Sequence, residues 1–534
     1  VASRSDVLAS SPMLTMPATG PSVGWISALA RATSLRMRRA YSSIVLPDGV
    51  SCMPWRLRSN SSVPMSSSSR RSCRDTAGCT RFNRLDARVT LPVSATVTNA
   101  RNCLRSIADT SIPKTDSTIR KFYCLRDPSK LIMDSTHAND ETRFMSASVF
   151  SAPDQYQEIR DAVRGLCNQF PADYHRKIDE ARGYPEAFVT ALTQAGWLAA
   201  LIPQEYGGPG LSMAEASVIM EEINRSGGNS GACHGQMYVM NTIVFSGTEA
   251  QKQRYLPRIA AGELRVQSMG VTEPTTGSDT TKLKTTAVKK DGRWVVNGQK
   301  VWISRVQHSD LLILLARTTP LDQVQKKSDG LSCFIVELDK AIGNGLTVRP
   351  ILNMVNHETN ELFFDNLELP EDALLGTEGK GLKVIFDGLN AERTLIAAEC
   401  IGDGYWFLEK ARDYASERKV FGRPIGQNQG IQFPLAESFI ELEAANLMRW
   451  RACEKIDARQ NAGVEANMAK YLAAKASWEA ANACLQTHGG FGFACEYDVE
   501  RKFRETRLYQ VAPISTNMIL GHVAEHVLQL PRSY

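Results

Sequence analysis

The first 133 residues contain no glutamate, although they carry 20 lysines and arginines and seven aspartates. The rest of the chain has 42 basic and 50 acidic residues, so the net charge of +5 combines a basic segment with a mildly acidic body. Basic side chains that bind nucleic acid are usually gathered on one face or interleaved with aromatic residues, and no such pattern is evident. The charge therefore does not indicate a nucleic-acid-binding protein.

Three patterns that mark membrane, metal-binding and doubly wound proteins are also missing. No uninterrupted apolar run approaches the length that crosses a bilayer, so we expect no membrane span. The twelve cysteines include no Cys-x-x-Cys pair, which argues against a disulfide framework or a zinc site, and we expect no bound metal. No Gly-x-Gly-x-x-Gly opens a strand–helix–strand unit, so a doubly wound dinucleotide-binding domain is not expected.

The segment 1–133 is rich in serine and arginine and has no clean periodicity, as in Ser66–Arg71 and Arg36–Arg39. Two interpretations stay open. The segment is either a low-order extension outside the mature protein, which would then begin at Met133 or Met145, or a transit peptide. In both cases we expect the segment to be dispensable for folding and activity.

From residue 145 onward the chain divides into three parts. Residues 145–265 carry apolar side chains at helical intervals, and residues 376–534 have the pattern of long helices. Between them, residues 266–375 contain short β-prone runs separated by turn pairs, namely Asp291-Gly292 and Asn297-Gly298. We therefore predict a mostly α fold with a central β-domain, because a doubly wound fold would alternate strands and helices.

Four motifs follow one another in this body. They are Met269–Asp279 (MGVTEPTTGSD), Asn297–Ser304 (NGQKVWIS), Glu417–Gly422 (ERKVFG) with Gln429 after it, and Gln486–Gly492 (QTHGGFG). Each is weak alone, since an Asn-Gly pair occurs in many hairpins and a Gly-Gly pair often ends a helix. Their joint order is the specific signal.

In that order the four motifs resemble those of the acyl-CoA dehydrogenases. The resemblance implies an N-terminal α domain, a β-barrel-like middle domain and a C-terminal four-helix bundle. It also implies FAD as cofactor, a homotetramer or homodimer, and electron transfer to an electron-transfer flavoprotein. The expected function is FAD-dependent α,β-dehydrogenation of an acyl-CoA in a fatty-acid or specialised-metabolite pathway. The compartment (mitochondrial matrix, peroxisome or cytoplasm) stays open.

Carried over by position, the resemblance implies two groups of cofactor-binding residues and a small substrate-binding group. The residues expected around the flavin ring are Met269, Val271, Thr272, Gly277, Ser278, Trp302 and Ser304. Those expected at the pyrophosphate and adenosine are Arg418, Phe421, Gln429, Gln486, Gly489, Gly490 and Asn517. Those expected to bind substrate are Ser278, Asn390 and Arg393. Hydroxyls suit the polar edge of a flavin, and an arginine suits a pyrophosphate.

The catalytic base is not where most of the family places it. Removal of the α-proton of a thioester requires a carboxylate, and Pro513 stands where most members have a glutamate. Some members, such as isovaleryl-CoA dehydrogenase, carry the glutamate earlier, in a Leu-Glu-Arg setting that resembles Glu392-Arg393. We therefore predict Glu392 as the base, with Glu399 and Glu505 as weaker substitutes.

Proline also lacks the backbone N–H that helps to hold the thioester carbonyl in relatives, and we expect Ile514 N–H to take its place. Two alternative functions remain open on the same scaffold: a flavin oxidase or monooxygenase, and a non-catalytic flavoprotein that has lost its base.

Overall fold

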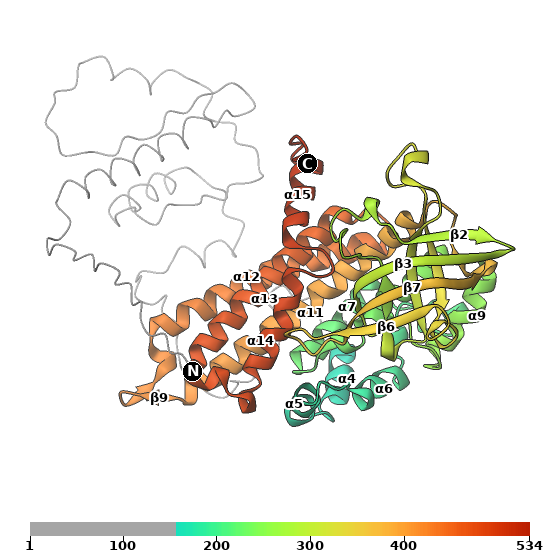
Figure 1. Ribbon diagram of the computed structural model, residues 1–534. Coiled ribbons are helices and arrows are strands. Elements are labelled where there is room, and N and C mark those ends of the chain that lie inside the picture. The colour runs from blue at the N-terminus through green and yellow to red at the C-terminus, as the bar shows by residue number, and fades with distance from the viewer. Residues whose placement is uncertain (1–155, 534) are drawn as a thin grey trace, which may run out of the picture. The chain divides into compact units, whose positions relative to one another are not determined.

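The computed structural model describes residues 156–533, which form three successive parts (Figure 1). Helices α4 to α9 come first, strands β1 to β8 follow, and helices α11 to α15 complete the chain. A mostly α fold with a central β-domain is thereby confirmed. The prediction for residues 1–133 lies outside the described residues.

The first part is helical and its helix starts are well capped. Ser212 and Glu215 form a reciprocal capping box at the start of α7, and Thr248 with Gln251 does the same at α9. The helices are α4 (Gln157–Cys167), α5 (Ala172–Glu180), α6 (Glu186–Gln194), α7 (Met213–Arg225), α8 (His234–Ser246) and α9 (Glu249–Ala260). Helix α8, which the periodicity did not reveal, is buried over most of its length, so it shows no amphipathic pattern.

The middle part is one sheet in the order β6-β7-β3-β2-β4-β5-β8, with β1 paired parallel to β4. The strands are β1 (Ser268–Gly270), β2 (Thr286–Lys290), β3 (Arg293–Ser304), β4 (Leu311–Arg317), β5 (Leu331–Glu337), β6 (Leu346–Ile351), β7 (Thr359–Pro370) and β8 (Leu374–Leu375), with the short helix α10 (Leu338–Ala341) after β5. Asp291 and Gly292 make the predicted turn between β2 and β3, both with positive φ.

The prediction of a turn at Asn297-Gly298 is wrong. This pair lies inside β3, where the register with β7 shifts between Val296 and Gly298. Gly298 has φ +147°, and a Cβ there would lie 2.5 Å from Thr285 Oγ1. The glycine therefore serves a bulge and a close strand approach, which the dipeptide alone does not distinguish from a hairpin.

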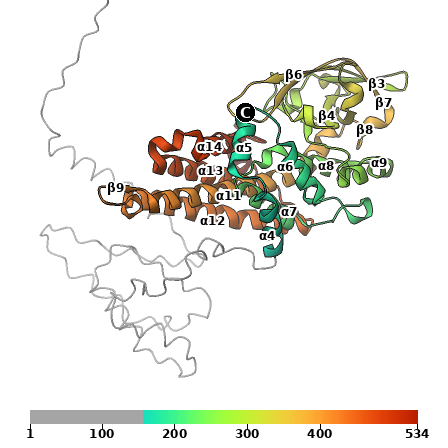
Figure 2. The ribbon, with the colours of Figure 1, turned by 90° about the horizontal axis from the view of Figure 1, so that it is seen from below.

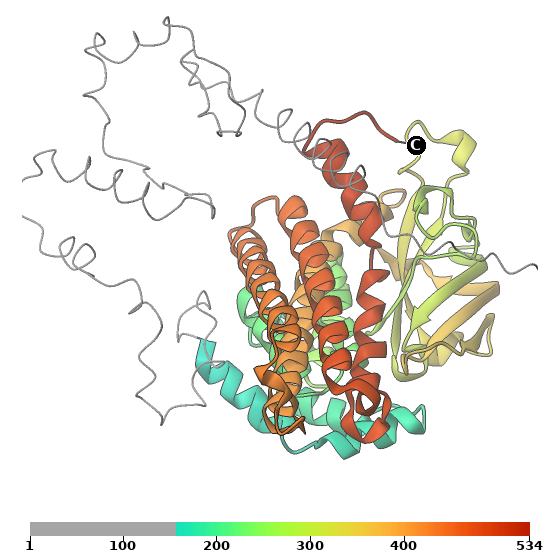
Figure 3. The ribbon, with the colours of Figure 1, turned by 90° about the vertical axis from the view of Figure 1, so that its left-hand side faces the viewer.

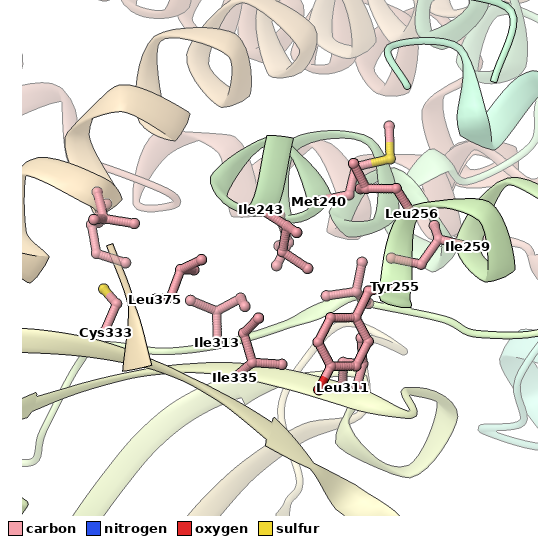
Figure 4. Packing of buried hydrophobic residues seen from close by; sticks show 14 of the residues in the cluster. Met240, Ile243, Tyr255, Leu256, Ile259, Leu311, Ile313, Cys333, Ile335 and Leu375 are labelled. Carbon is pink, nitrogen blue, oxygen red and sulfur yellow. The ribbon is translucent and has the colours of Figure 1, made fainter. Parts of the chain in front are cut away.

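The sheet packs against the first helices through an apolar core (Figure 4). Met240 and Ile243 of α8, with Leu256 and Ile259 of α9, meet Leu311 and Ile313 of β4, Ile335 of β5 and Leu375 of β8. Strands β4 and β5 are nearly continuous apolar runs, as expected for strands that are buried on both faces. The core fixes α8 against the sheet.

The last part is built on three long helices that lie side by side (Figure 3). They are α11 (Gly381–Glu417), α12 (Gln429–Asp457) and α13 (Gly463–His488), followed by α14 (Val499–Arg507) and α15 (Thr516–His526). The small hairpin β9 (Lys419–Val420) and β10 (Arg423–Pro424) joins α11 to α12. In Figure 2 these helices extend to one side and the strands lie on the other, with α7 against α11.

The contact between α11 and α7 depends on Gly402, and we expect Gly402→Ala to destabilise the protein strongly. A Cβ at this position would lie 2.2 Å from the main-chain oxygen of Glu221, so the two helices would have to separate. Overpacking of this kind typically costs about 1–3 kcal/mol, occasionally more. Chemical denaturation measures the loss.

A matched control is Gly165→Ala, which places the same methyl group on an exposed face of α4 with nothing within 4 Å. This variant should be as stable as the parent or slightly more stable, because alanine is the better helix former. Equal stability of the two variants would contradict the close approach at Gly402.

Candidate active site

Glu392 lies on α11 in a buried environment that faces α8. It is 6 % exposed, and burial raises its pKa to about 7, an effect that His234, Arg393 and a hydrogen bond with Tyr238 partly offset. A carboxylate with such a pKa is a stronger base than an exposed glutamate and is still half ionised near neutral pH. The environment therefore suits a proton acceptor.

Helix α8 supplies two of the groups around Glu392. His234 and Tyr238 are one turn apart and on the same face, with ring centroids 5.4 Å apart. His234 Nδ1 lies 3.0 Å from both carboxylate oxygens of Glu399, which is two turns after Glu392 on α11. The two helices thus meet along a row of polar side chains.

Glu399 is held from a second side. The hydroxyl of Tyr509 donates to Glu399 Oε2 at 3.1 Å, and Asn224 Nδ2 donates to the Tyr509 hydroxyl and to the main-chain oxygen of Glu399. Glu399 is fully buried, so these donors compensate the loss of water around its carboxylate. Glu399 is engaged as a hydrogen-bond acceptor in this network.

Glu505, the other substitute base, lies in a buried ion cluster. Arg501 Nη1 donates to its Oε1 at 2.8 Å, and Lys502 Nζ lies 3.2 Å from its Oε2. Two cations stabilise the ionised form of this carboxylate, which makes it a poor proton acceptor. Glu392 thus combines burial with a raised pKa, whereas the effect of burial on Glu505 is outweighed by Arg501 and Lys502, which hold the pKa of Glu505 below its usual range.

Two of the segments expected around the flavin ring come together in the sheet. Val301 N–H donates to Thr272 O at 3.0 Å, and Ser268 Oγ donates to Ser304 O at 2.9 Å, so segments 268–272 and 301–304 lie side by side. Lys300 Nζ, fully buried, donates to Val271 O and pairs with Glu273, both at 3.0 Å. This buried lysine fixes the loop that follows β1.

The exposed groups of the first two motifs fit a planar, extended cofactor. Trp302 is 60 % exposed and has φ +63°, which is unusual for a large aromatic residue in a sheet. Gly277 has open space where a side chain would be, and Ser278 beside it is exposed. Ser304 Oγ is 2.9 Å from His357 Nε2. An aromatic face, a hydroxyl and an accessible backbone are suitable contacts for a flavin.

Most of the residues expected at the pyrophosphate lie at the other end of α11, whereas Asn517 lies on α15, just after the segment that contains Pro513. Arg418 lies over the ring of Phe491, 5.6 Å from its centroid, so the third and fourth motifs do meet. Phe421 is fully exposed in the turn of the β9–β10 hairpin; the other exposed members at this end are Gln429, Gln486, Gly489 and Gly490. Because 26 residues of helix rise about 39 Å, one chain does not place these residues next to Glu392.

The segment that contains Pro513 is anchored by Lys470 of α13. Lys470 Nζ donates to Tyr509 O at 2.6 Å and to Ile514 O at 2.7 Å. Burial lowers the Lys470 pKa to about 8. Near the segment, Arg393 Nη1 donates to Asn390 Oδ1 at 3.2 Å.

The sequence did not single out four residues of this site: His234, Tyr238, His357 and Lys470. All four lie in segments that belong to none of the four motifs. A usable signal was the presence of histidine within apolar stretches, although a lone histidine is more often a satisfied core residue. In the described part of the chain, no cluster of three histidine, cysteine or carboxylate side chains could hold a metal ion, and none of its helices is long and apolar enough to cross a membrane.

Comparison with known proteins matches all three parts. The models described as acyl-CoA dehydrogenase N-terminal, middle and C-terminal domain match residues 153–263, 268–367 and 379–528. The chain is 36% identical over 398 residues to acyl-CoA dehydrogenase FadE12 of Mycobacterium tuberculosis, and the match covers 73% of this chain and 100% of that protein. It is 33% identical to glutaryl-CoA dehydrogenase of Desulfococcus multivorans, and this match covers 69% of this chain and 95% of that protein.

Solved structures agree with the sequence comparison. A glutaryl-coenzyme A dehydrogenase in complex with glutaryl-CoA is similar with a TM-score of 0.66 and 30% identity, covering 72% of this chain and 98% of that chain. Butyryl-CoA dehydrogenase from Megasphaera elsdenii is similar with a TM-score of 0.66 and 27% identity, covering 71% of this chain and 99% of that chain.

Proposed function

The chain belongs to the acyl-CoA dehydrogenase family, and we propose that FAD is its flavin and Glu392 its catalytic base. As a member of this family the protein is a flavin-dependent oxidoreductase that dehydrogenates an acyl-CoA. The observation that supports Glu392 is its burial on α11 with a pKa raised to about 7.

In the proposed reaction the acyl-CoA loses one hydrogen from Cα as a proton and one from Cβ as a hydride, and becomes an enoyl-CoA. Glu392 accepts the proton. When bound, FAD supplies the hydride acceptor. Burial of Glu392 excludes water and raises its proton affinity, while Tyr238 fixes the carboxylate by a hydrogen bond.

The remaining site residues have proposed roles in binding. We assign Met269, Val271, Thr272, Gly277, Ser278, Trp302 and Ser304 to the flavin ring, and Arg418, Phe421, Gln429, Gln486, Gly489, Gly490 and Asn517 to the pyrophosphate and adenosine. Ser278, Asn390 and Arg393 are assigned to the acyl-CoA. Support comes from the exposure of Trp302 and the open space at Gly277.

Two subunits would be needed to complete the site if the cofactor is shared across a boundary. Helix α12 presents apolar side chains to solvent at seven-residue spacing: Phe433 at 60 %, Ile440 at 67 % and Leu447 at 45 % exposure. An apolar stripe of this kind is suited to association of helices, which supports a homotetramer or homodimer. Electrons would leave to an electron-transfer flavoprotein.

The test is to purify the protein, record its absorption spectrum for bound flavin, and follow anaerobic bleaching with a panel of acyl-CoAs. Bleaching by an acyl-CoA without peroxide formation in air supports the dehydrogenase. Steady peroxide formation without an added acceptor would indicate the oxidase alternative, and a flavin that no acyl-CoA bleaches would indicate the non-catalytic one.

Lys470→Met should slow flavin reduction about 10–100-fold while FAD content stays near that of the parent. The substitution frees the carbonyls of Tyr509 and Ile514, and the segment between them contains Pro513, where relatives hold the thioester carbonyl. Loss of one such donor typically costs about 10²–10³ in rate. Stopped-flow bleaching under anaerobic conditions measures the effect.

The control is Lys475→Met on the same helix, whose ammonium is exposed and lies 3.5 Å from Glu441. This variant should reduce its flavin at the parent rate. If Lys470→Met does the same, the lysine does not position the segment.

A further inference from the structure

Helix α8 runs along α11 in the opposite direction, and two contacts fix the register of the two helices. A Cβ on Gly388 of α11 would lie 3.2 Å from Thr242 Cγ2, and both carboxylate oxygens of Glu399 lie 3.0 Å from His234 Nδ1. Glu392 comes one turn after Gly388 and two turns before Glu399, so the three residues share one face of α11. Glu392 is therefore opposite the stretch of α8 that begins at His234 and ends at Thr242.

His234 and Glu399 form a buried imidazole–carboxylate pair. His234 is 7 % exposed and Glu399 is fully buried. The hydroxyl of Tyr509 donates to Glu399 Oε2 at 3.1 Å, and Asn224 Nδ2 donates to this hydroxyl at 3.2 Å. These two groups are hydrogen-bond donors without a charge, and a buried carboxylate without a counter-charge is costly. An imidazole ring with a proton on each nitrogen supplies that counter-charge.

Glu392 is surrounded by charged and titratable groups from three helices. They are Arg393 and Glu399 of α11, His234 and Tyr238 of α8, and Lys470 of α13. Burial has the largest effect on the pKa of Glu392 and raises it. Among the neighbours, His234 lowers this pKa most and Arg393 next, whereas Glu399 raises it less than either of them lowers it. A guanidinium is always charged, so the influence that can change with its partner is that of His234.

Five other titratable groups that face the imidazole–carboxylate pair are uncharged at pH 7. Burial raises the pKa of the thiols and phenols among them and lowers that of His357, whose ring centroid is 6.1 Å from that of His234. The five groups are Cys233, Tyr238, His357, Cys400 and Tyr509. Asp403, one turn further along α11, is itself paired with Lys502 at 2.5 Å. The charge that faces Glu392 from α8 is thus the one on His234.

We propose that His234 is a positioning residue that acts on Glu392 as a cation, and that Glu399 holds the imidazole in this charged form, so that the base is ionised at neutral pH. This inference rests on the proposed function, because it takes Glu392 to be the base. Without the charge of His234, burial would keep Glu392 protonated at pH 7, and a protonated carboxyl group does not accept the α-proton.

The first test is the pH profile of anaerobic flavin reduction in His234→Asn, measured by stopped flow on the FAD-loaded protein at saturating acyl-CoA. Asparagine keeps an N–H near the place of Nδ1 and carries no charge. A neighbouring charge typically shifts a carboxyl pKa by about 1–3 units. We expect the midpoint of the profile to rise by about one pH unit or more, so that the rate at pH 7 falls about fivefold or more. The plateau at high pH should stay within about threefold of that of the parent.

Glu399→Gln in the same assay separates two roles of Glu399 by the sign of the change. If Glu399 holds His234 in its charged form, the glutamine loses that charge and the midpoint rises, although less than in His234→Asn, because a like charge disappears as well. If Glu399 acts on Glu392 only as a like charge, the midpoint falls. We expect the rise.

The matched control is His308→Gln, which neutralises another histidine–glutamate pair. His308 Nε2 lies 2.9 Å from Glu358 Oε1, and the amide nitrogen of glutamine takes the place of Nε2. His308 is not among the groups that act on Glu392. This variant should have the midpoint of the parent.

A His234→Asn midpoint equal to that of the parent would overturn the inference, and a loss of rate that is uniform over all pH values would then assign a structural role to the histidine. A lower midpoint in Glu399→Gln would also overturn it, and this variant decides alone if His234→Asn is not recovered with flavin. Both results leave the proposed function standing as long as Glu392→Gln reduces its flavin slowly. If Glu392→Gln reduces its flavin as fast as the parent, the proposed function itself fails.

Discussion

Glu392→Gln should bind FAD and acyl-CoA but lose several orders of magnitude in the rate of flavin reduction. The glutamine keeps the shape and the hydrogen-bonding contact with Tyr238 and removes the proton acceptor. General acid–base assistance alone is worth about 10²–10⁴, and an essential base in a water-excluding site exceeds that range. Anaerobic stopped-flow bleaching at saturating substrate gives the ratio.

The pH dependence follows from the raised pKa. Glu392 acts as a base only when ionised, and its pKa is about 7, so the rate of flavin reduction in the parent should increase as the pH rises through 7. The stability changes with pH in the opposite direction. A carboxyl group whose pKa is higher in the folded than in the unfolded protein stabilises the fold while it is protonated, and this contribution is lost as the pH rises from the ordinary glutamate pKa of 4.5 through about 7. Glu392→Gln should therefore gain stability relative to the parent at pH 8 but not at pH 5.

Asp413→Asn is the matched control, since it also replaces a carboxylate by an amide, at an exposed position of the same helix. It should leave the rate unchanged. A Glu392→Gln enzyme that bleaches at the parent rate would contradict the assignment and direct attention to Glu399, the predicted substitute on the same helix.

Lys502→Met should destabilise the protein by about 3–5 kcal/mol, the usual result of removing one member of a buried ion cluster. Lys502 Nζ lies 2.5 Å from Asp403 Oδ1 and donates to Gly228 O at 2.9 Å, and both charged residues are fully buried. Its removal leaves Asp403 without a cation. Burial already raises the Asp403 pKa to about 7, with Lys502 opposing the rise, so the loss should be larger at pH 8 than at pH 6.

Denaturant titration of the two proteins at both pH values checks this expectation. The control is Lys383→Met, which removes an exposed lysine that is paired with Asp387 one turn further along α11. This variant should change the stability little. The double variant Lys502→Met/Asp403→Leu should recover part of the loss, because no uncompensated carboxylate remains. Equal stability of the parent and Lys502→Met would mean that the buried ion pair of Lys502 and Asp403 makes no net contribution to the stability of the fold.

The family and the order of helices and strands could be predicted from the sequence because their signals are local. Motifs keep their spacing, and the periodicity of α7 and α9 reports a buried face. The prediction of a turn at Asn297-Gly298 is wrong because a β-bulge and a hairpin turn favour the same residues. Only the pairing of β3 with β7 distinguishes the bulge from the turn.

The environment of Glu392 could not be predicted in the same way. His234 and His357 are 123 positions apart in the chain and belong to different parts of the fold, so their proximity is a tertiary property. Helix α8 gives no amphipathic pattern in the sequence, because a helix that is buried on nearly all sides lacks the apolar period of a surface helix. The polar network was therefore visible only once α8 was placed against α11.

The length of α11 has a consequence for how this protein can vary. Its 37 residues form a rod of about 55 Å, and insertion of one residue rotates everything beyond it by about 100°. Glu392, Glu399 and Asp403 lie on this rod, and Arg418 lies at its far end. A one-residue insertion between Asp403 and Arg418 would therefore turn either the three carboxylates or Arg418 away from their present neighbours. A substitution on α11 leaves this register unchanged, whereas an insertion or deletion changes the 26-residue spacing from Glu392 to Arg418 and with it the direction of every side chain beyond that point.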